Sequence, residues 1–260
     1  MSARAHAAGL SAFALTDHDT LNGVAAATSA AQSLGVRVVA GCEFSVRAPW
    51  GELHLLAYFL PTDDPALNAF LAQARTAREQ RGAQMVEKLQ RLGVEIDLED
   101  LAVQVGNSAV GRPHVARALI DAGVVDDFEE AFDRYLGRGR PAFVAKPLPA
   151  LREVTDLVHG VRGLAVAAHL GDRGHESQLR AFKADGLDGI EVRHPSHPKH
   201  VETRLSKLAR LLDLAVSGGS DWHGEESTAL AHAPLGGMEV PMEWLEELER
   251  RKEKAYGGTT

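Results

Sequence analysis

The sequence has little of several features that define common protein classes. It has one cysteine in 260 residues, which excludes a disulfide framework and a cysteine-rich zinc site. No apolar run reaches the roughly 18 residues that a membrane span needs, and the opening MSARAHAAGL is too short and too polar for a signal peptide. The formal net charge of −8 argues against a protein that binds long nucleic acids along their backbone. We therefore expect a cytoplasmic protein without a membrane partner.

Histidine, by contrast, is abundant. There are twelve histidines, against eight Phe, three Trp and three Tyr. Apolar residues make up 45% of the chain, which is enough for one sizeable core or for a core with an inserted lobe.

The apolar pattern divides the chain into three parts. Strand-like runs alternate with helical stretches in residues 1–62 and 149–260, which indicates an α/β fold with parallel strands and right-handed crossovers. Strand-like runs disappear in residues 63–148, which we interpret as a helical insertion. The expected strands lie near 11–19, 36–46, 52–60, 163–170, 188–194 and 214–224, and the PWG turn at 49–51 favours pairing of the third with the second. The expected insertion helices lie near 66–92, 97–104, 113–122 and 127–136.

Histidines and acids gather where the expected strands end. In a barrel of alternating strands and helices these ends share one face, where active sites form. Converging imidazoles and carboxylates would suit a divalent cation, and two or three such cations can act together in phosphoester cleavage. The residues concerned are His18, Glu43, His169, His194, Asp221 and His223, with His54 inside the strand that follows Glu43.

Each of these residues alone also has an ordinary structural explanation. A single histidine is more often a hydrogen-bonding residue than a ligand. Asp17 and Asp19 could be turn or helix-cap residues, Glu43 a surface acid, and Cys42 a small buried hydrophobe. Their joint placement at strand ends is what favours a metal site. The histidines away from strand ends are interpreted as structural or solvated: His6, His159, His175, His200 and His232.

Several motifs together resemble the PHP family, the polymerase and histidinol phosphatase metallohydrolases. They are TDHDT at 16–20, GCEFSV at 41–46, HLLAY at 54–58, AAHLG at 167–171 and SGGSDWHG at 217–224. The segments GRPHVARAL at 111–119, YLGRGRPAFV at 135–144 and HPSHP at 194–198 resemble one branch of it. That branch contains nucleoside-3′,5′-bisphosphate phosphatases that also act as 5′-to-3′ exoribonucleases on short RNA.

The resemblance implies a distorted (β/α)7 barrel with up to three divalent metals at the carboxyl ends of its strands. Carried over by position, Glu43 would bridge two metals, His54 and His169 would bind the second, His18 and His223 the third, and Asp221 the first. Asp17 and Asp19 would orient imidazoles or hold a loop.

The same resemblance implies phosphate contacts in the insertion and after one strand. Arg112, His114, Arg140 and His197 are the matching positions, and His197 would also be the catalytic residue that assists the leaving oxygen. Arginines on a helical insertion are otherwise usually solvated.

One family segment has no counterpart in the sequence. The family begins with a strand carrying an Asp-Leu-His-x-His motif, whereas Met1 falls in what resembles the helix after it. A start codon further upstream, a fragment, or a degenerate homologue would each explain this. We favour the first because the other ligand positions survive, and we expect an extended chain to be more stable. Leu170 also stands where the branch usually has proline.

The implied function is metal-dependent hydrolysis of phosphate esters. The expected substrates are 3′,5′-bisphosphonucleosides and short 5′-phosphorylated RNA, without stable binding of long nucleic acids. Mn²⁺ is the favoured cation, with Zn²⁺, Fe²⁺ or Mg²⁺ as alternatives, at two to three ions per complete site. The alternatives are a phosphatase of another small phosphomonoester, such as histidinol phosphate or a sugar phosphate, and an inactive metal- or nucleotide-binding remnant.

Overall fold

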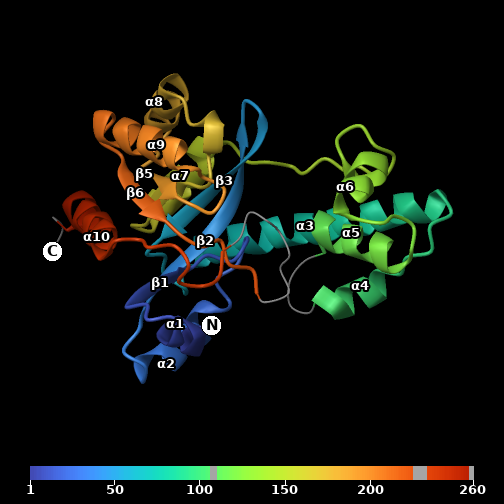
Figure 1. Cartoon of the computed structure of the whole chain (residues 1–260), viewed down its shortest axis with the longest axis horizontal. Coiled ribbons are helices and arrows are strands. Elements are labelled where there is room, and N and C mark those ends of the chain that lie inside the picture. The colour runs from blue at the N-terminus through green and yellow to red at the C-terminus, as the bar shows by residue number, and fades with distance from the viewer. Residues whose placement is uncertain (106–109, 225–232, 258–260) are drawn as a thin grey trace. The chain divides into compact units, whose positions relative to one another are not determined.

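The computed structural model divides the chain into two compact units (Figure 1). We call Met1–Asn68 with Leu148–Thr260 the barrel unit, and Ala69–Pro147 the helical unit. The structure describes residues 1–105, 110–224 and 233–257. His232, which we interpret from the sequence as structural or solvated, lies outside the described residues.

The barrel unit contains a six-stranded sheet whose strands follow one another in chain order from β1 to β6. Helices and strands alternate through most of this unit, so the predicted α/β class is confirmed. The strands are β1 (Ala12–Leu15), β2 (Arg37–Ala48), β3 (Gly51–Tyr58), β4 (Leu164–Ala167), β5 (Gly189–Arg193) and β6 (Ala215–Gly218).

The sheet contains both parallel and antiparallel pairs. Alternation with helices predicts parallel strands, whereas the PWG turn predicts that the strand after it pairs back with its predecessor, and β3 runs antiparallel to β2 and also to β4. The reason is the short connection after β2: Pro49 and Trp50 link it to β3, too few residues for a crossover helix, so the chain turns back as a hairpin. The pairs β1–β2, β4–β5 and β5–β6 are parallel.

Strand β2 is long because its two halves pair with different neighbours. Its first four residues pair with β1, and the stretch from Gly41 onward pairs with β3. The change of partner needs a glycine. A Cβ atom on Gly41 would lie 2.8 Å from the carbonyl oxygen of Ala57 and 2.8 Å from Cγ2 of Thr16. The carboxylate of Glu43 follows two residues later.

Helices flank the sheet of the barrel unit. Helix α1 packs on α2, which packs on β2, and the two lie together near β1 in Figure 1. Helix α7 contacts β2 and β4, α9 contacts β5 and β6, and α10 contacts β6. The bounds are α1 (Ser2–Ala7), α2 (Val24–Gln32), α7 (Leu151–Gly160), η2 (Gly171–Arg173), α8 (Glu176–Ala184), α9 (Lys199–Leu211) and α10 (Met242–Tyr256).

The amphipathic pattern of α9 shows why these helices form. Val201, Leu205 and Ala209 recur every four residues and are all buried, so one apolar stripe faces the sheet. The strands β4 and β5 are buried at nearly every position, as expected for strands covered on both faces.

The helical unit has a core of its own. Met85 and Leu89 of α3 and Val115 and Leu119 of α5 belong to one buried apolar cluster. The helices are α3 (Pro65–Arg91), which begins before the unit boundary, α4 (Leu98–Val105), α5 (Arg112–Asp121), α6 (Phe128–Ala131) and the π-helical turn η1 (Phe132–Leu136). Among all described residues of the chain, no helix is both long enough and apolar enough to cross a membrane.

We predict that Gly41→Ala lowers the free energy of unfolding, because its Cβ would press on backbone. Such overpacking costs on the order of 1–3 kcal/mol. Gly160→Ala is the matched control. A Cβ there meets nothing within 4 Å at the end of helix α7, so this change should be neutral or stabilise by about 0.5–1 kcal/mol. Urea unfolding of both variants measures the difference, and equal stabilities would contradict the packing argument.

Candidate functional site

The side chain of Glu43 lies at the centre of a cluster of imidazoles in the barrel unit. Glu43 is only 5% exposed. Its Oε1 is 2.7 Å from Nδ1 of His54 and 3.4 Å from Nε2 of His169, and its Oε2 is 3.3 Å from Nε2 of His18. Burial alone would raise the pKa of Glu43, but hydrogen bonds with His169 and His54 and the charge of His18 hold the pKa well below its usual range. The carboxylate is therefore ionised.

Main-chain pairing places His18 beside Glu43. The two residues form an isolated parallel bridge beyond the last pair of β1 and β2. The N–H of Glu43 donates to the carbonyl of Asp17 at 3.1 Å, and the N–H of Asp19 donates to the carbonyl of Glu43 at 3.1 Å. The loop after β1 thus keeps the register of the sheet for three more residues, and this register brings His18 to the carboxylate.

Strands β3 and β4 supply the next two imidazoles. His54 pairs with Ser45 in the β2–β3 register, so it lies on the same face of the sheet as Glu43, diagonally across the two strands. The N–H of Ala168 donates to the carbonyl of His54 at 3.0 Å, which places His169 at the end of β4. Nδ1 of His54 and Nε2 of His169 are 3.2 Å apart.

Hydrogen bonds also set the protonation of His54. Burial lowers its pKa, but hydrogen bonds to Glu43 and Glu52 outweigh burial and raise the pKa to about 9. At neutral pH this imidazole therefore carries a proton that it shares with the acids around it.

A second group forms around Asp221, in the loop after β6. Its Oδ2 lies 3.5 Å from Nε2 of His194, and Nδ1 of His223 lies 2.7 Å from its carbonyl oxygen. Burial raises the pKa of Asp221, but His194 and His223 outweigh burial and lower it. The negative charge of Glu43 acts in the opposite direction on the same carboxyl, which indicates that the two acids share one environment.

The imidazole rings connect the two groups in a continuous row. Neighbouring ring centroids are 4.9 to 5.4 Å apart. The row runs through His18, His54, His169, His194 and His197.

The donor atoms fit a divalent cation. His18, Glu43 and His54 each offer one ligand atom, and the three atoms lie within 4.8 Å of one another. Imidazole nitrogen with carboxylate oxygen is a donor set that Zn²⁺ and neighbouring transition metals accept. Nδ1 of His54 and Nε2 of His169 are 3.2 Å apart, so their lone pairs would repel each other unless a proton or a cation lay between them. This distance places His169 next to the group of three.

The two acids beside His18 have different surroundings. Asp17 has its pKa raised by burial, an effect that the charge of His223 partly offsets. Asp19 is 6% exposed and has a φ of 54°, a left-handed conformation that non-glycine residues rarely adopt. Orientation of the imidazoles by these two acids stays a prediction.

His197 is placed differently from the other four rings of the row. Its Nε2 accepts from the N–H of Gly171 at 3.0 Å, and its Nδ1 is 2.9 Å from the carbonyl of Val192. Both ring nitrogens already have main-chain partners, and the side chain is 5% exposed. The catalytic and phosphate-binding roles that the sequence suggests for His197 stay predictions.

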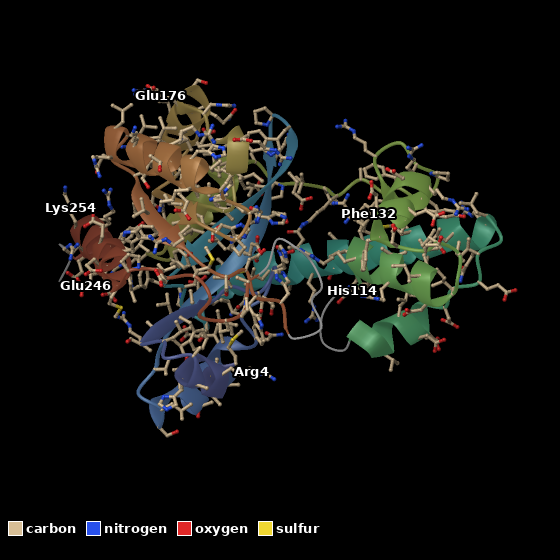
Figure 2. All side chains as sticks on the ribbon, in the orientation of Figure 1. Arg4, His114, Phe132, Glu176, Glu246 and Lys254 are labelled. Carbon is tan, nitrogen blue, oxygen red and sulfur yellow. The ribbon has the colours of Figure 1, made fainter. Side chains whose placement is uncertain are left out.

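The other three phosphate-contact candidates belong to the helical unit. Arg112 stacks over the ring of Phe132 at 5.7 Å, and His114 lies on the same helix, α5 (Figure 2). Nδ1 of His114 accepts from the N–H of Gly111 at 3.0 Å, so the neutral ring carries its proton on Nε2. Burial and the charge of Arg78 lower the pKa of His114. Arg140 follows the turn that begins at Gly137.

Reasoning from the sequence missed Glu191, and it placed His194 among the strand-end residues suited to a divalent cation without assigning it to a particular ion. Glu191 lies in β5, is 4% exposed, and accepts a hydrogen bond from the N–H of His169 at 2.7 Å. Burial raises its pKa to about 8, and the nearby charges of Asp221 and Glu43 add to the effect. The available signal was an acid inside the apolar run GIEV, where an unpartnered carboxylate would be costly.

The histidines away from the strand ends have ordinary surroundings. His6, His175 and His200 are exposed, and His159 pairs with Asp188 at 2.8 Å. Cys42 is fully buried, as expected of a small apolar side chain.

Comparison with known proteins identifies the family. The model of the PHP domain matches residues 1–137, more than half of the chain. The chain belongs to the PHP family. The predicted family is therefore confirmed, and with it the enzyme class, a metal-dependent hydrolase of phosphoric esters.

PHP relatives cover most of the chain. The 3′,5′-nucleoside bisphosphate phosphatase of Chromobacterium violaceum is 34% identical over 239 residues, 88% of this chain and 83% of its own. The 5′-3′ exoribonuclease of Haemophilus influenzae is 31% identical over 225 residues, 85% of this chain and 82% of its own.

A solved PHP-type structure confirms the predicted fold. The crystal structure of a protein from Bifidobacterium adolescentis, described provisionally as a metal-dependent phosphoesterase, superposes with a TM-score of 0.85 at 33% identity. The match covers 96% of this chain and 89% of the other. The sheet described here has six strands, against the seven that the resemblance implies for the family barrel.

We predict that Mn²⁺ binding to this PHP site depends on Glu43 and displaces protons. The pKa of His54 is raised to about 9, so at pH 7 a cation must replace the proton on this imidazole. Titration calorimetry in two buffers of different ionisation enthalpy measures both affinity and proton release. Glu43→Ala should abolish binding, while His200→Ala, which changes an exposed histidine of α9, should leave it intact. Unchanged affinity in Glu43→Ala would refute the assignment.

Proposed function

We propose that this PHP phosphoesterase releases phosphate from nucleoside 3′,5′-bisphosphates and acts on short 5′-phosphorylated RNA. The observation that carries the proposal is the ionised, buried carboxylate of Glu43 with three imidazoles within 3.4 Å of its oxygens. Two relatives over 30% identical are named a 5′-3′ exoribonuclease and a 3′,5′-nucleoside bisphosphate phosphatase. The net charge of −8 favours a small or short substrate over a long RNA bound along its backbone.

Six side chains are the proposed metal ligands. Glu43 would hold two ions, one together with His54 and His169 and the other together with Asp221. His18 and His223 would hold a third. We propose Mn²⁺ as the cation, since carboxylate donors suit it, with Zn²⁺, Fe²⁺ or Mg²⁺ as alternatives.

The chemistry of the reaction divides between the cation and the chain. Divalent cations, when bound, would supply Lewis acidity, which polarises phosphoryl oxygens and lowers the pKa of water toward neutrality. The chain holds the ligands in place, and the carboxylates of Glu43 and Asp221 offset the positive charge of the ions. Asp17, through its proximity to the charge of His223, is suited to orient that imidazole. No covalent protein intermediate is needed.

We propose that the helical unit supplies the phosphate contacts. Arg112 and Arg140 carry permanent positive charge and can bind a second phosphate of the substrate. His114 is suited to a different task. Because its Nδ1 accepts from the N–H of Gly111 and its pKa is lowered, it stays neutral and presents Nε2–H as a hydrogen-bond donor.

The direct test is phosphate release from a 3′,5′-bisphosphonucleoside. We predict that release requires Mn²⁺, ceases with a chelator, and returns when Mn²⁺ is restored. Glu43→Ala should lower the rate by more than the about 10- to 100-fold that loss of an outer partner of a metal ligand costs. His200→Ala is the matched control and should keep the wild-type rate. Activity that survives both the chelator and Glu43→Ala would refute this mechanism.

A substrate panel separates the proposal from its alternatives. Turnover of histidinol phosphate or a sugar phosphate, with none of bisphosphonucleosides, would indicate another small-molecule phosphatase. Metal and nucleotide binding without turnover of any phosphoester would indicate an inactive remnant.

A second prediction concerns the arginines. Arg112→Ala and Arg140→Ala should each raise KM for a 3′,5′-bisphosphonucleoside by about 10-fold or more, because a charge-assisted hydrogen bond contributes about 1.5–3 kcal/mol. KM for the matching 5′-monophosphate should change less. Arg117→Ala is the matched control, since Arg117 lies on the same helix and stacks on Phe128 at 5.1 Å. Equal effects on both substrates would argue against a second-phosphate contact.

A further inference from the structure

The loop that carries His169 is bonded to two buried side chains from the neighbouring strand and its loop. This loop leaves β4 and runs through Leu170 to Gly171. Glu191 accepts from the N–H of His169 at 2.7 Å, and His197 accepts from the N–H of Gly171 at 3.0 Å. We refer to Glu191 and His197 together as the β5 clamp, since Glu191 lies in β5 and His197 shortly after it.

The backbone held by the β5 clamp has an uncommon conformation. His169 has a φ of 28° and Gly171 a φ of 52°, both in the left-handed region. This region costs a residue with a Cβ about 1–3 kcal/mol, so it persists only where the surroundings enforce it. Leu170 between them has a φ of −59°, close to the value that a proline ring would fix. Leucine in place of the proline usual in this branch is therefore compatible with the φ angle at position 170.

The two members of the clamp are themselves fixed. The Nδ1–H of His197 donates to the carbonyl of Val192 at 2.9 Å, which leaves its Nε2 as an acceptor for Gly171. Glu191 is 4% exposed and His197 is 5% exposed, so water cannot easily replace either bond. An N–H left without an acceptor in such surroundings costs about 1–3 kcal/mol.

The clamp acts on the position of one candidate ligand. The ring of His169 lies 3.2 Å from Nδ1 of His54 and 3.4 Å from the nearer oxygen of Glu43. Its place in the cluster depends on where its backbone is held, because metal–nitrogen distances are fixed to within about 0.2 Å. Loss of the clamp would free the loop to relax away from its left-handed conformation.

We infer that Glu191 and His197 are positioning residues that hold the His169 loop in its metal-binding conformation through two main-chain hydrogen bonds. On this inference His197 acts on the site through Gly171, and it does not act on the leaving group of the substrate. The inference rests on the metal centre of the proposed function but is independent of which phosphoester is hydrolysed.

The first test compares Glu191→Gln with Glu191→Leu. The amide oxygen of glutamine can accept the same N–H bond, whereas leucine cannot. Equilibrium dialysis with Mn²⁺ should show near wild-type affinity for Glu191→Gln and an affinity about 10- to 100-fold weaker for Glu191→Leu. Equal losses in both variants would overturn the inference, because the carboxylate would then be needed as a ligand in its own right.

The second test uses His197→Phe, which keeps a ring and removes both hydrogen bonds. Mn²⁺ affinity should fall by about 10-fold or more, and activity should recover at saturating Mn²⁺. Unchanged affinity with a lost rate at saturating Mn²⁺ would overturn the inference, since that is the behaviour of a residue that acts on the substrate. If the protein turns over no phosphoester, the Mn²⁺ affinity of the variant still tests the inference. Failure of the proposed function can therefore be distinguished from failure of the inference.

A third measurement needs neither metal nor substrate. In metal-free protein, amide hydrogen exchange of His169 and Gly171 should be slow in the wild type. Exchange should be fast at His169 in Glu191→Leu and fast at Gly171 in His197→Phe. Unchanged protection in both variants would overturn the inference.

His159→Ala is the control for general destabilisation. His159 bonds Asp188, which also accepts from the N–H of Ala165 in β4, so its loss should lower the melting temperature of the protein. Mn²⁺ affinity and exchange of His169 and Gly171 should nevertheless stay at wild-type values. A loss of affinity in His159→Ala equal to that in the clamp variants would overturn the inference, because stability alone would then explain the effect.

Discussion

A buried carboxylate that stays ionised is the constraint on which the site depends. Burying the charge of Glu43 without partners would cost several kcal/mol, a large part of the stability of a domain. The surrounding imidazoles offset that cost through hydrogen bonds and positive charge. Glu43, the rings of His18, His54 and His169, and the ions they would bind are therefore mutually dependent. Loss of any of the three imidazoles would raise the pKa of Glu43, and loss of Glu43 would lower the pKa of His54.

The sheet of the barrel unit makes this arrangement possible. Its mixed directions matter here, because the hairpin between β2 and β3 brings His54 diagonally across from Glu43 on one face. The parallel pairs on either side bring loop residues to the same end of the sheet. Glycine at position 41 allows β2 to change partners just before the central carboxylate. The absence of a side chain at Gly41 thus allows the strand geometry that positions the carboxylate of Glu43.

The sequence predicts the positions of the candidate site better than the interactions within it. The strand-end rule locates His18, His169 and Asp221 because apolar runs are readable along the chain. It is wrong about the position of Glu43 within its strand, because β2 continues to Ala48. The PWG turn favours the hairpin pairing of β3 with β2, but no pattern in the sequence indicates the second antiparallel pairing of β3, with β4. The insertion is readable as helices, but the bond between Nδ1 of His114 and Gly111 depends on ring orientation, which no pattern encodes.

The omission of Glu191 has a more general cause. In a strand, an acid between isoleucine and valine looks like a solvent-facing residue of an alternating pattern. Only the three-dimensional structure shows that its carboxylate is 4% exposed and faces the N–H of His169. A hydrogen bond from a side chain to the main chain of another strand produces no recurring spacing in the sequence. Residues that position a backbone in this way are therefore the ones that sequence patterns do not reveal.

The main-chain bridge between His18 and Glu43 fixes the location of the site independently of the chemistry of its side chains. Its two hydrogen bonds run between main-chain atoms of Asp17, Asp19 and Glu43. Every amino acid but proline can make such bonds, so the location persists whichever side chains occupy these positions. Single substitutions could therefore exchange one cation for another, or one reaction for another, while the strands continue to present the same points in space. A scaffold of this kind can diversify its chemistry by point mutation without first having to refold.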